Sequence, residues 1–303
     1  MLVLGIIAAG GVFAGTNPAY TQYELTHHFK TAAAKFVVTE PELLPAVLAA
    51  AKEYHIEQAS IRIFNPINQA IPDGFSSWQT LMECGERDWV RFDDEKTSKS
   101  TTAARLFSSG TTGLPKAASL SHYNLIAQHT LVNETNRPPY EVRNPMFTAG
   151  PYLRLTIAIL EKPSRLLYLP LFHAAMVPVA HVTPLRTGDH SYILRRFELE
   201  PMLSSLQKYQ ITDLALVPPV AVAVIKYPHI HKYFLKSVKV AHTGAGPLDK
   251  EHQNTLSRLL SPEASFTQVW GMTETSCVAS KFYFPEKDDT GSVGRMMPNL
   301  DVK

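Results

Sequence analysis

Residues 197–227 read FELEPMLSSLQKYQITDLALVPPVAVAVIKY, and the order of patterns in this stretch decides the fold class. Apolar side chains recur every three or four positions over 197–210, which predicts an amphipathic helix. The next residues, ITDLALV, predict a buried strand that ends at the prolines Pro218 and Pro219. AVAVIKY then predicts a second helix, so helix and strand alternate.

The same alternation continues outward in both directions. Toward the N-terminus, PELLPAVLAAAKEY at 41–54 predicts a helix, and SIRIF at 60–64 predicts a short strand. Toward the C-terminus, we expect a strand at 238–243, a helix at 247–260 and a strand at 266–270. Elements alternating at this spacing predict βαβ units around a largely parallel sheet, which is an α/β fold.

Two other stretches lie outside this alternation. The apolar start, 1–15, has no lysine or arginine before Lys30 and is shorter than the ~18 residues that span a bilayer. It therefore predicts a helix that runs into a turn at Gly10 and Gly11 and then a buried strand, rather than a secretion signal or a membrane span. Residues 85–104 are polar and lack periodicity, which predicts a surface connection.

Composition excludes several classes of protein. Of the 303 residues, 45% are hydrophobic and 18% charged, which is typical of a folded chain rather than a disordered one. A net charge of +2 gives no reason to expect nucleic acid as a partner. Two cysteines, Cys84 and Cys277, form neither a disulfide framework nor a metal-ligand pattern. We interpret them as idle thiols in a reducing compartment, and we expect a cytoplasmic protein.

The motif with the clearest chemistry is LFSSGTTGLPK at 106–116. An apolar strand end leads into glycines that let backbone N–H groups approach an anion, hydroxyls that add donors, and the single cation of Lys116. This pattern suits a polyphosphate, although a flexible turn would have a similar composition. It is not a P-loop, because that motif has glycine directly before the lysine and Ser or Thr directly after it.

The string SSGTTGLPK resembles the phosphate loop of the acyl-adenylate-forming (AMP-binding) superfamily, which contains acyl-CoA ligases, luciferases and the adenylation domains of peptide synthetases. The surrounding sequence is most similar to the 4-coumarate–CoA ligase-like branch. Five further segments match this family in order: GGVFAGTNPAYTQYEL at 10–25, PLFHAA at 170–175, HTGAGPLDKE at 242–251, QVWGMTET at 268–275 and TGSVGRMMPN at 290–299. The resemblance covers nearly the whole chain and implies the large N-terminal domain of such an enzyme, with the small C-terminal domain absent.

The resemblance also implies a nucleotide site. The residues expected to hold the β- and γ-phosphates of ATP are Ser108, Ser109, Gly110, Thr111, Thr112, Gly113 and Lys116. The residues expected around the adenine are Gly244, Ala245 and Gly246 on one side and Gln268, Val269, Trp270, Gly271 and Met272 on the other. Trp270 taken alone would be interpreted as a core aromatic. Ala117 stands where the family usually has glycine, which affects the expected mobility of the loop rather than its phosphate contacts.

The catalytic roles come from the same resemblance. Thr273 is expected to contact phosphate, and Glu274 is expected to hold Mg²⁺, since a carboxylate suits a hard cation that bridges phosphate oxygens. His173 is expected to orient the acid, with a hydrogen-bonded core histidine as the alternative.

Five other residues have weaker signals. Ala175 and Met176 would face the acyl group, and Arg196 would meet CoA or be a plain surface arginine. His122 and Asn124, after Ser121, are better interpreted as capping a helix.

The implied activity is the ATP-dependent conversion of a small-molecule carboxylic acid to acyl-AMP and then to an acyl-CoA thioester. A non-catalytic remnant that binds ATP or an acyl ligand is the first alternative, and an adenylation module that loads a carrier protein is the second. The family's ribose-binding aspartate, hinge and C-terminal lysine have no counterpart in the sequence, so we expect weak or no activity of the chain alone. We interpret the whole chain, 1–303, as one incomplete large domain with a predicted insertion at 143–165, for which a surface loop is the alternative.

Overall fold

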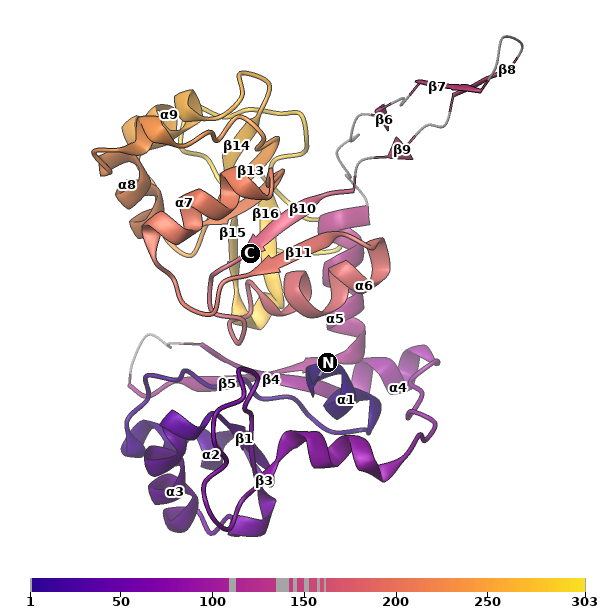
Figure 1. Ribbon diagram of the computed structural model, residues 1–303, viewed down its shortest axis with the longest axis vertical. Helices are drawn as coiled ribbons and strands as arrows, with labels where there is room; N and C mark the ends of the chain where they lie inside the picture. Colours follow the sequence, from indigo (N-terminus) through magenta and orange to yellow (C-terminus); the bar gives the residue numbers. More distant parts are fainter. Residues whose placement is uncertain are drawn as a thin grey trace. The chain divides into compact units, whose positions relative to one another are not determined.

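The computed structural model describes residues 2–108, 113–134, 142–143, 146–149, 153–156, 159–160 and 162–302 (Figure 1). The chain forms two compact units. The first contains Met1–Asn124 with Phe172–Ala174, and the second contains Leu125–Leu171 with Ala175–Lys303. No described helix is long and apolar enough to cross a membrane.

The first unit is built around a small parallel sheet and a hairpin. Its elements are α1 (Leu2–Ala8), α2 (Gln22–Ala32), β1 (Val37–Thr39), η1 (Pro41–Leu43), α3 (Leu44–Glu53), η2 (Gln58–Ser60), β2 (Ile61–Ile63), β3 (Ser76–Ser77), η3 (Trp78–Cys84), α4 (Glu95–Ser100), β4 (Thr102–Ser108) and β5 (Lys116–Ser121). β1, β2 and β3 pair in parallel in that order. Apolar residues of α2 and α3 cover this sheet, with Ile61 and Ile63 buried at the centre of the cluster. The predicted helix at 41–54 and strand at 60–64 are confirmed.

Local sequence explains where α2 begins and ends. The Thr21 side chain accepts from the Glu24 N–H and the Glu24 side chain accepts from the Thr21 N–H, which is a capping box that satisfies free donors at the start of the helix. At the other end Ala33 adopts a left-handed conformation, with φ 50°, and its N–H bonds back to the last turn.

The predicted surface connection at 85–104 is wrong in its second half. α4 forms there, capped by the Asp94 carboxylate, which accepts from the Thr97 N–H at 2.8 Å. β4 starts at Thr102, and Ala103 and Ala104 are fully buried. Alanines and a two-turn polar helix carry almost no hydrophobic period, so burial here depends on tertiary contacts that the pattern does not contain.

The N-terminal expectation is confirmed in its first part only. α1 covers Leu2–Ala8 and ends in a turn at Gly10, whose φ is +77°. The buried strand expected after it is reduced to one bridge between Phe13 and Ala104, because only the Phe13 backbone meets a neighbouring strand. The Phe13 N–H donates to Ala103 and its carbonyl accepts from Arg105.

The second unit contains a five-stranded sheet in the order β11-β10-β12-β13-β14, and every pair in it is parallel. Its strands are β10 (Ser164–Leu167), β11 (His190–Ile193), β12 (Asp213–Leu216), β13 (Val240–Thr243) and β14 (Ser265–Gln268), and its main helices are α7 (Leu199–Lys208), α8 (Pro218–Lys226) and α9 (Lys250–Leu259). α7, β12, β13 and α9 lie within the segments predicted for them, and α8 and β14 overlap theirs. The sequence predicted no strand at β10 or β11, but the α/β fold is confirmed. α8 begins at Pro218, because a proline that ends a strand also fits the first turn of a helix.

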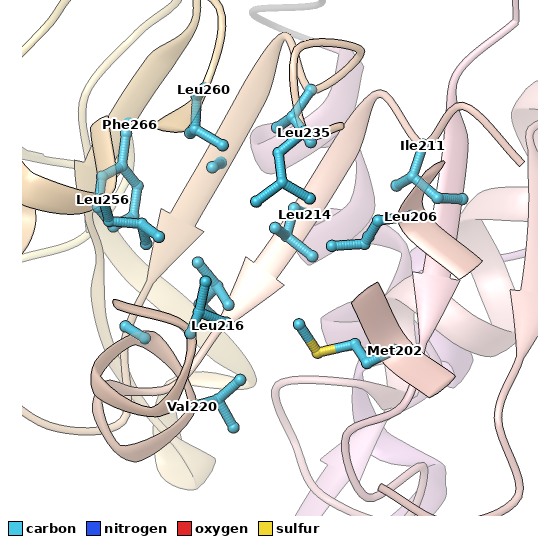
Figure 2. Packing of buried hydrophobic residues seen from close by; sticks show 14 of the residues in the cluster. Met202, Leu206, Ile211, Leu214, Leu216, Val220, Leu235, Leu256, Leu260 and Phe266 are labelled. Atoms are coloured by element: carbon cyan, nitrogen blue, oxygen red, sulfur yellow. The ribbon is translucent and has the colours of Figure 1, made fainter. Parts of the chain in front are cut away.

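The core of this unit lies between the helices and the sheet. Figure 2 shows Leu206 from α7 beside Ile211 and Leu214, and Leu256 from α9 beside Phe266. Met202 from α7 belongs to the same cluster. Met202 and Leu206 are fully buried, and Leu256 is 1% exposed. Burial at the apolar positions that recur along α7 and α9 holds both helices against the strands.

Further elements of the second unit lie outside the five-stranded sheet and its main helices. They are α5 (His122–His129), which begins in the first unit, and η4 (Thr130–Glu134), η5 (Pro178–Val182), α6 (Thr183–Thr187), η6 (Ile230–Lys232), β15 (Trp270–Met272), η7 (Thr273–Thr275), β16 (Cys277–Lys281) and β17 (Arg295–Met296). β15, β16 and β17 form an antiparallel sheet.

The predicted insertion overlaps this unit. Within 143–165, β6 (Val142–Arg143) pairs with β9 (Ile159–Leu160), and β7 (Met146–Ala149) pairs with β8 (Leu153–Thr156). The last two residues, Ser164 and Arg165, lie in β10, inside the five-stranded sheet. The rest of the segment lies partly outside the described residues, and the insertion stays a prediction for the residues before β10.

Candidate functional site

In the first unit, the phosphate-loop motif connects the two strands of a hairpin. β4 and β5 pair antiparallel from Thr102 to Ser108, and Ser108 lies opposite Lys116. The apolar strand end predicted before the motif is therefore β4, and Lys116 starts the return strand with its side chain exposed. This strand–loop–strand arrangement differs from the strand–loop–helix of a P-loop. Ser109, Gly110, Thr111 and Thr112 lie outside the described residues, and their roles stay predictions.

Position 113 requires glycine because of its backbone conformation and not because a side chain would collide. Its φ of +98° is one that other residues rarely adopt, while a Cβ there would meet no atom within 4 Å. After β5, the Ser121 Oγ accepts from the Asn124 N–H at 3.2 Å, and the Asn124 side chain accepts from the Ser121 N–H at 2.9 Å. The capping interpretation is confirmed for Asn124 but not for His122. The His122 ring stacks on Phe92, with 3.8 Å between centroids.

In the second unit, two predicted adenine segments meet at one edge of the parallel sheet. β13 and β14 are neighbours, with Thr243 beside Gln268, so the residues that follow both strands emerge at the same edge. The Val269 N–H donates to the Thr243 carbonyl at 2.9 Å. A Cβ on Gly244 would lie 2.9 Å from the Val269 Cγ2 and 3.1 Å from its carbonyl oxygen, so the approach requires glycine.

The Gln268 side chain fixes the loop that follows Gly246. Its amide is 3% exposed; it accepts from the Leu248 N–H at 3.0 Å and donates to the Leu248 carbonyl at 2.7 Å. It also donates to the Gln253 Oε1 at 2.9 Å, and the Gln253 Nε2 donates to the Asp288 carbonyl at 2.7 Å. Sequence reasoning missed Gln253 and Asp288, which lie outside the adenine motifs. The Gln268 amide thus holds protein backbone, and a direct contact of this residue with adenine stays a prediction.

The open side of this edge carries apolar surface. Ala245 and Gly246 are exposed, and Ala245 has a left-handed φ of 64° between its two glycines. Trp270 is 45% exposed and Met272 44%, so Trp270 is not a core aromatic. An exposed indole beside glycine-rich backbone is a surface on which a flat base can stack.

Thr243 is a third residue that sequence reasoning missed. Its Oγ1 is fully buried at the carboxyl end of β13 and has no hydrogen-bond partner among the described residues. Its place directly before Gly244 was the available signal. A buried hydroxyl without a partner costs free energy, which makes it a candidate to contact a ligand.

The segment after Trp270 presents one carboxylate. A Cβ on Gly271 would lie 1.7 Å from the Cys277 carbonyl oxygen, so only glycine lets β15 pair with β16 here. Thr273 is buried, whereas Glu274 is exposed and makes no hydrogen bond or ion pair with any described residue. Burial raises the pKa of the Cys277 thiol to about 12, which keeps it protonated and unreactive.

The position of Glu274 is compatible with Mg²⁺. Mg²⁺ is usually held by one or two carboxylates together with substrate phosphates and waters, rather than by a cage of protein ligands. The described residues contain no group of three His, Cys, Asp or Glu side chains that could hold a metal ion. A single free carboxylate therefore fits a cation that arrives with a phosphate ligand.

For the residues predicted to contact the acid and CoA, the structure shows chiefly how far each one is exposed. His173 is exposed in the first unit, although partial burial of its ring lowers its pKa. In the second unit Met176 is 2% exposed and Ala175 is half-buried. Arg196 is exposed between β11 and α7, and no described contact joins it to the edge that carries Gly244. The roles of these residues stay predictions.

Known proteins resemble the chain over its whole length. The model of the AMP-binding enzyme family matches residues 1–303. The phenylacetyl-CoA ligase epaB of Aspergillus niger is 46% identical over 307 residues, covering 100% of this chain and 53% of that protein. The 4-coumarate–CoA ligase 4 of Arabidopsis thaliana is 30% identical, covering 99% of this chain and 50% of that protein. The chain thus spans about half the length of the curated relatives it matches.

Solved structures share the fold. ATP-bound MatB from Rhodopseudomonas palustris has a TM-score of 0.74 at 23% identity, covering 98% of this chain and 52% of that one. A long-chain-fatty-acid–CoA ligase (FadD1) from Archaeoglobus fulgidus has a TM-score of 0.77 at 19% identity, covering 98% of this chain and 54% of that one. With the family model and the relatives, these findings show that the chain belongs to the AMP-binding enzyme family.

Proposed function

We propose that the chain forms the Mg-ATP-binding part of a carboxylate–CoA ligase. The observation that carries the proposal is the edge of the parallel sheet in the second unit. There, Gly244 and Val269 approach so closely that a side chain on Gly244 would collide, and an exposed Trp270 follows. The named relatives that act on phenylacetate and 4-coumarate support a small carboxylic acid as the other substrate.

In the first step, a carboxylate oxygen of the acid attacks the α-phosphorus of ATP and pyrophosphate leaves. Lys116 neutralises charge on the β- and γ-phosphates, and Thr273 contacts phosphate. Glu274 holds Mg²⁺, which when bound neutralises the charge that develops on the phosphate oxygens. The contribution of the chain is positioning and electrostatic stabilisation, since phosphoryl and adenylyl transfer leave little covalent chemistry to side chains.

In the second step, the CoA thiolate attacks the acyl carbonyl and AMP leaves. His173 orients the acid, and Arg196 meets CoA. A carrier-protein thiol could take the place of CoA in this step. Because Arg196 is proposed to contact CoA, we expect Arg196→Ala to impair the use of CoA without impairing adenylation. An undiminished rate with CoA in that variant would favour the carrier-protein module.

A non-catalytic remnant that binds ATP or an acyl ligand is the second candidate function. Carboxylate-dependent exchange of pyrophosphate into ATP separates the two candidates, because a remnant shows none. We expect weak or no thioester formation by the chain alone, and rapid acyl-CoA production by the purified protein would contradict that expectation. We also expect a cytoplasmic location.

Thermal unfolding with and without Mg-ATP tests nucleotide binding. At 100 times its Kd, a ligand adds about 2.7 kcal/mol of stability, which raises the Tm by about 2 °C or more for a chain of this size. Lys116→Ala combined with Glu274→Ala is the control, because both side chains are exposed and their removal leaves the core intact. A shift in the parent alone supports the proposal, and equal midpoints with and without Mg-ATP in the parent contradict it.

A further inference from the structure

Helix α2 lies against the hairpin that carries the phosphate-loop motif. The Arg105 guanidinium on β4 donates a hydrogen bond to the Ala32 carbonyl in the last turn of α2. Two neighbouring histidines of the same helix, His27 and His28, lie nearer its middle. Each of them contacts one end of the loop between β4 and β5.

His28 supports the end of β4. Its ring stacks on Phe107, with 3.9 Å between centroids and 24° between planes, and Phe107 directly precedes Ser108. The same imidazole is 3% exposed, and its Nε2 lies 2.8 Å from the Thr16 Oγ1. A flat buried ring held by a hydrogen bond restricts where the Phe107 side chain can lie.

His27 supports the start of β5. Its Nε2 lies 2.8 Å from the Pro115 carbonyl oxygen, across 88 residues of sequence. Because a carbonyl oxygen only accepts, the Nε2 of His27 carries the hydrogen and donates it. That carbonyl belongs to the same planar peptide as the Lys116 N–H, so the bond fixes the plane from which the Lys116 side chain starts.

We propose that His27 and His28 are positioning residues for the phosphate loop. His28 sets the Phe107–Ser108 end and His27 sets the Pro115–Lys116 end, so that Ser108 and Lys116 stay opposite each other in the hairpin. This inference rests on the proposed function, because it assigns the histidines a role only if Lys116 meets a polyphosphate. Neither histidine touches the ligand in this proposal.

Calorimetric titration with two probes tests the inference on the full chain. Mg-tripolyphosphate reports on the contacts to phosphate and Mg²⁺, to which the phosphate loop contributes, and adenosine reports on the contacts to the nucleoside. We expect His27→Ala to weaken Mg-tripolyphosphate binding about five- to tenfold, the usual effect of one lost hydrogen bond at a site, and to leave adenosine binding unchanged. His27→Gln, whose amide can still donate to the Pro115 carbonyl, should recover most of the affinity.

The control variants separate positioning from general loss of structure. Gln22→Ala removes an exposed side chain from the first turn of α2 and should change neither affinity. His28→Phe, which keeps a ring on Phe107, should retain more affinity for Mg-tripolyphosphate than His28→Ala. His27 is half-buried, so its substitution could affect folding. A melting midpoint close to that of the parent shows that a His27 variant is folded.

The outcomes are distinct. Equal Mg-tripolyphosphate affinity of parent and His27→Ala would overturn the inference while leaving the proposed function standing. Parallel losses for Mg-tripolyphosphate and adenosine would also overturn it, because they indicate a general structural role. A parent chain that binds neither probe would refute the proposed function and this inference together.

Discussion

Replacing Gln253 with methionine tests how the loop after Gly246 is held. The Gln253 side chain is fully buried, and methionine fills a similar volume, so the substitution removes hydrogen bonds without opening a large cavity. Three bonds are lost: the one from the Gln268 Nε2 at 2.9 Å, the one to the Asp288 carbonyl at 2.7 Å and a long one to the Asp288 Oδ2 at 3.5 Å, which contributes little.

The expected loss follows from what remains paired. The Gln268 Nε2 still donates to the Leu248 carbonyl, so that donor keeps one partner. The Asp288 carbonyl loses the bond from Gln253 and gains no replacement from a thioether. At about 1 kcal/mol for each net bond and about 1 kcal/mol for a poorly solvated acceptor, the unfolding free energy should fall by about 2–3 kcal/mol.

Urea unfolding followed by circular dichroism measures this loss, with equal m-values required for the comparison. Gln207→Met is the matched control, since its exposed amide oxygen accepts from the Phe234 N–H and water can replace that bond. We expect the control to lose less than about 0.5 kcal/mol. If Gln253→Met lost no more than the control, the buried amide network would not be what holds the loop.

Two further predictions concern stability. Gly271→Ala should lower the unfolding free energy by about 3 kcal/mol or more, because the new Cβ would lie 1.7 Å from the Cys277 carbonyl oxygen, whereas Gly5→Ala, with no atom within 4 Å, should not destabilise in urea titrations. Burial first, and the charge of His27 second, lower the pKa of His28 to about 4. Because the unfolded histidine binds its proton near pH 6.5, stability should fall by about 1.4 kcal/mol per pH unit from pH 6.5 down to 4. His28→Leu should show a shallower decline across that window, and parallel curves would contradict the assignment.

The order of elements in the second unit could be read from the sequence alone. α7, β12 and α8 follow one another within 197–227, and each has a local period or a proline boundary that needs no tertiary information. The strand end before the phosphate-loop motif was likewise predictable, since its apolar residues precede a run of turn formers. Local patterns sufficed where an element buries one apolar face.

Local patterns failed where burial involves small or polar residues. α4 is a six-residue polar helix, and Ala103 and Ala104 of β4 are buried although alanine gives a weak hydrophobic signal. The expected strand near Phe13 shrank to one bridge for the converse reason, since apolar sequence does not guarantee a pairing partner. In each case the segments of the same chain that pack against the element decided whether it was buried or paired.

The sequence by itself determined the α/β class, the family and the segments that form the candidate nucleotide site. It could not show that Gln268 holds the Leu248 backbone 20 residues away, that Gln253 reaches Asp288 across 35 residues, or that His27 bonds to Pro115. Periodicity reports which face of an element is buried, because it depends on neighbours three or four residues apart. Hydrogen bonds between distant side chains and backbone depend on strand register and helix docking, which only the tertiary structure decides.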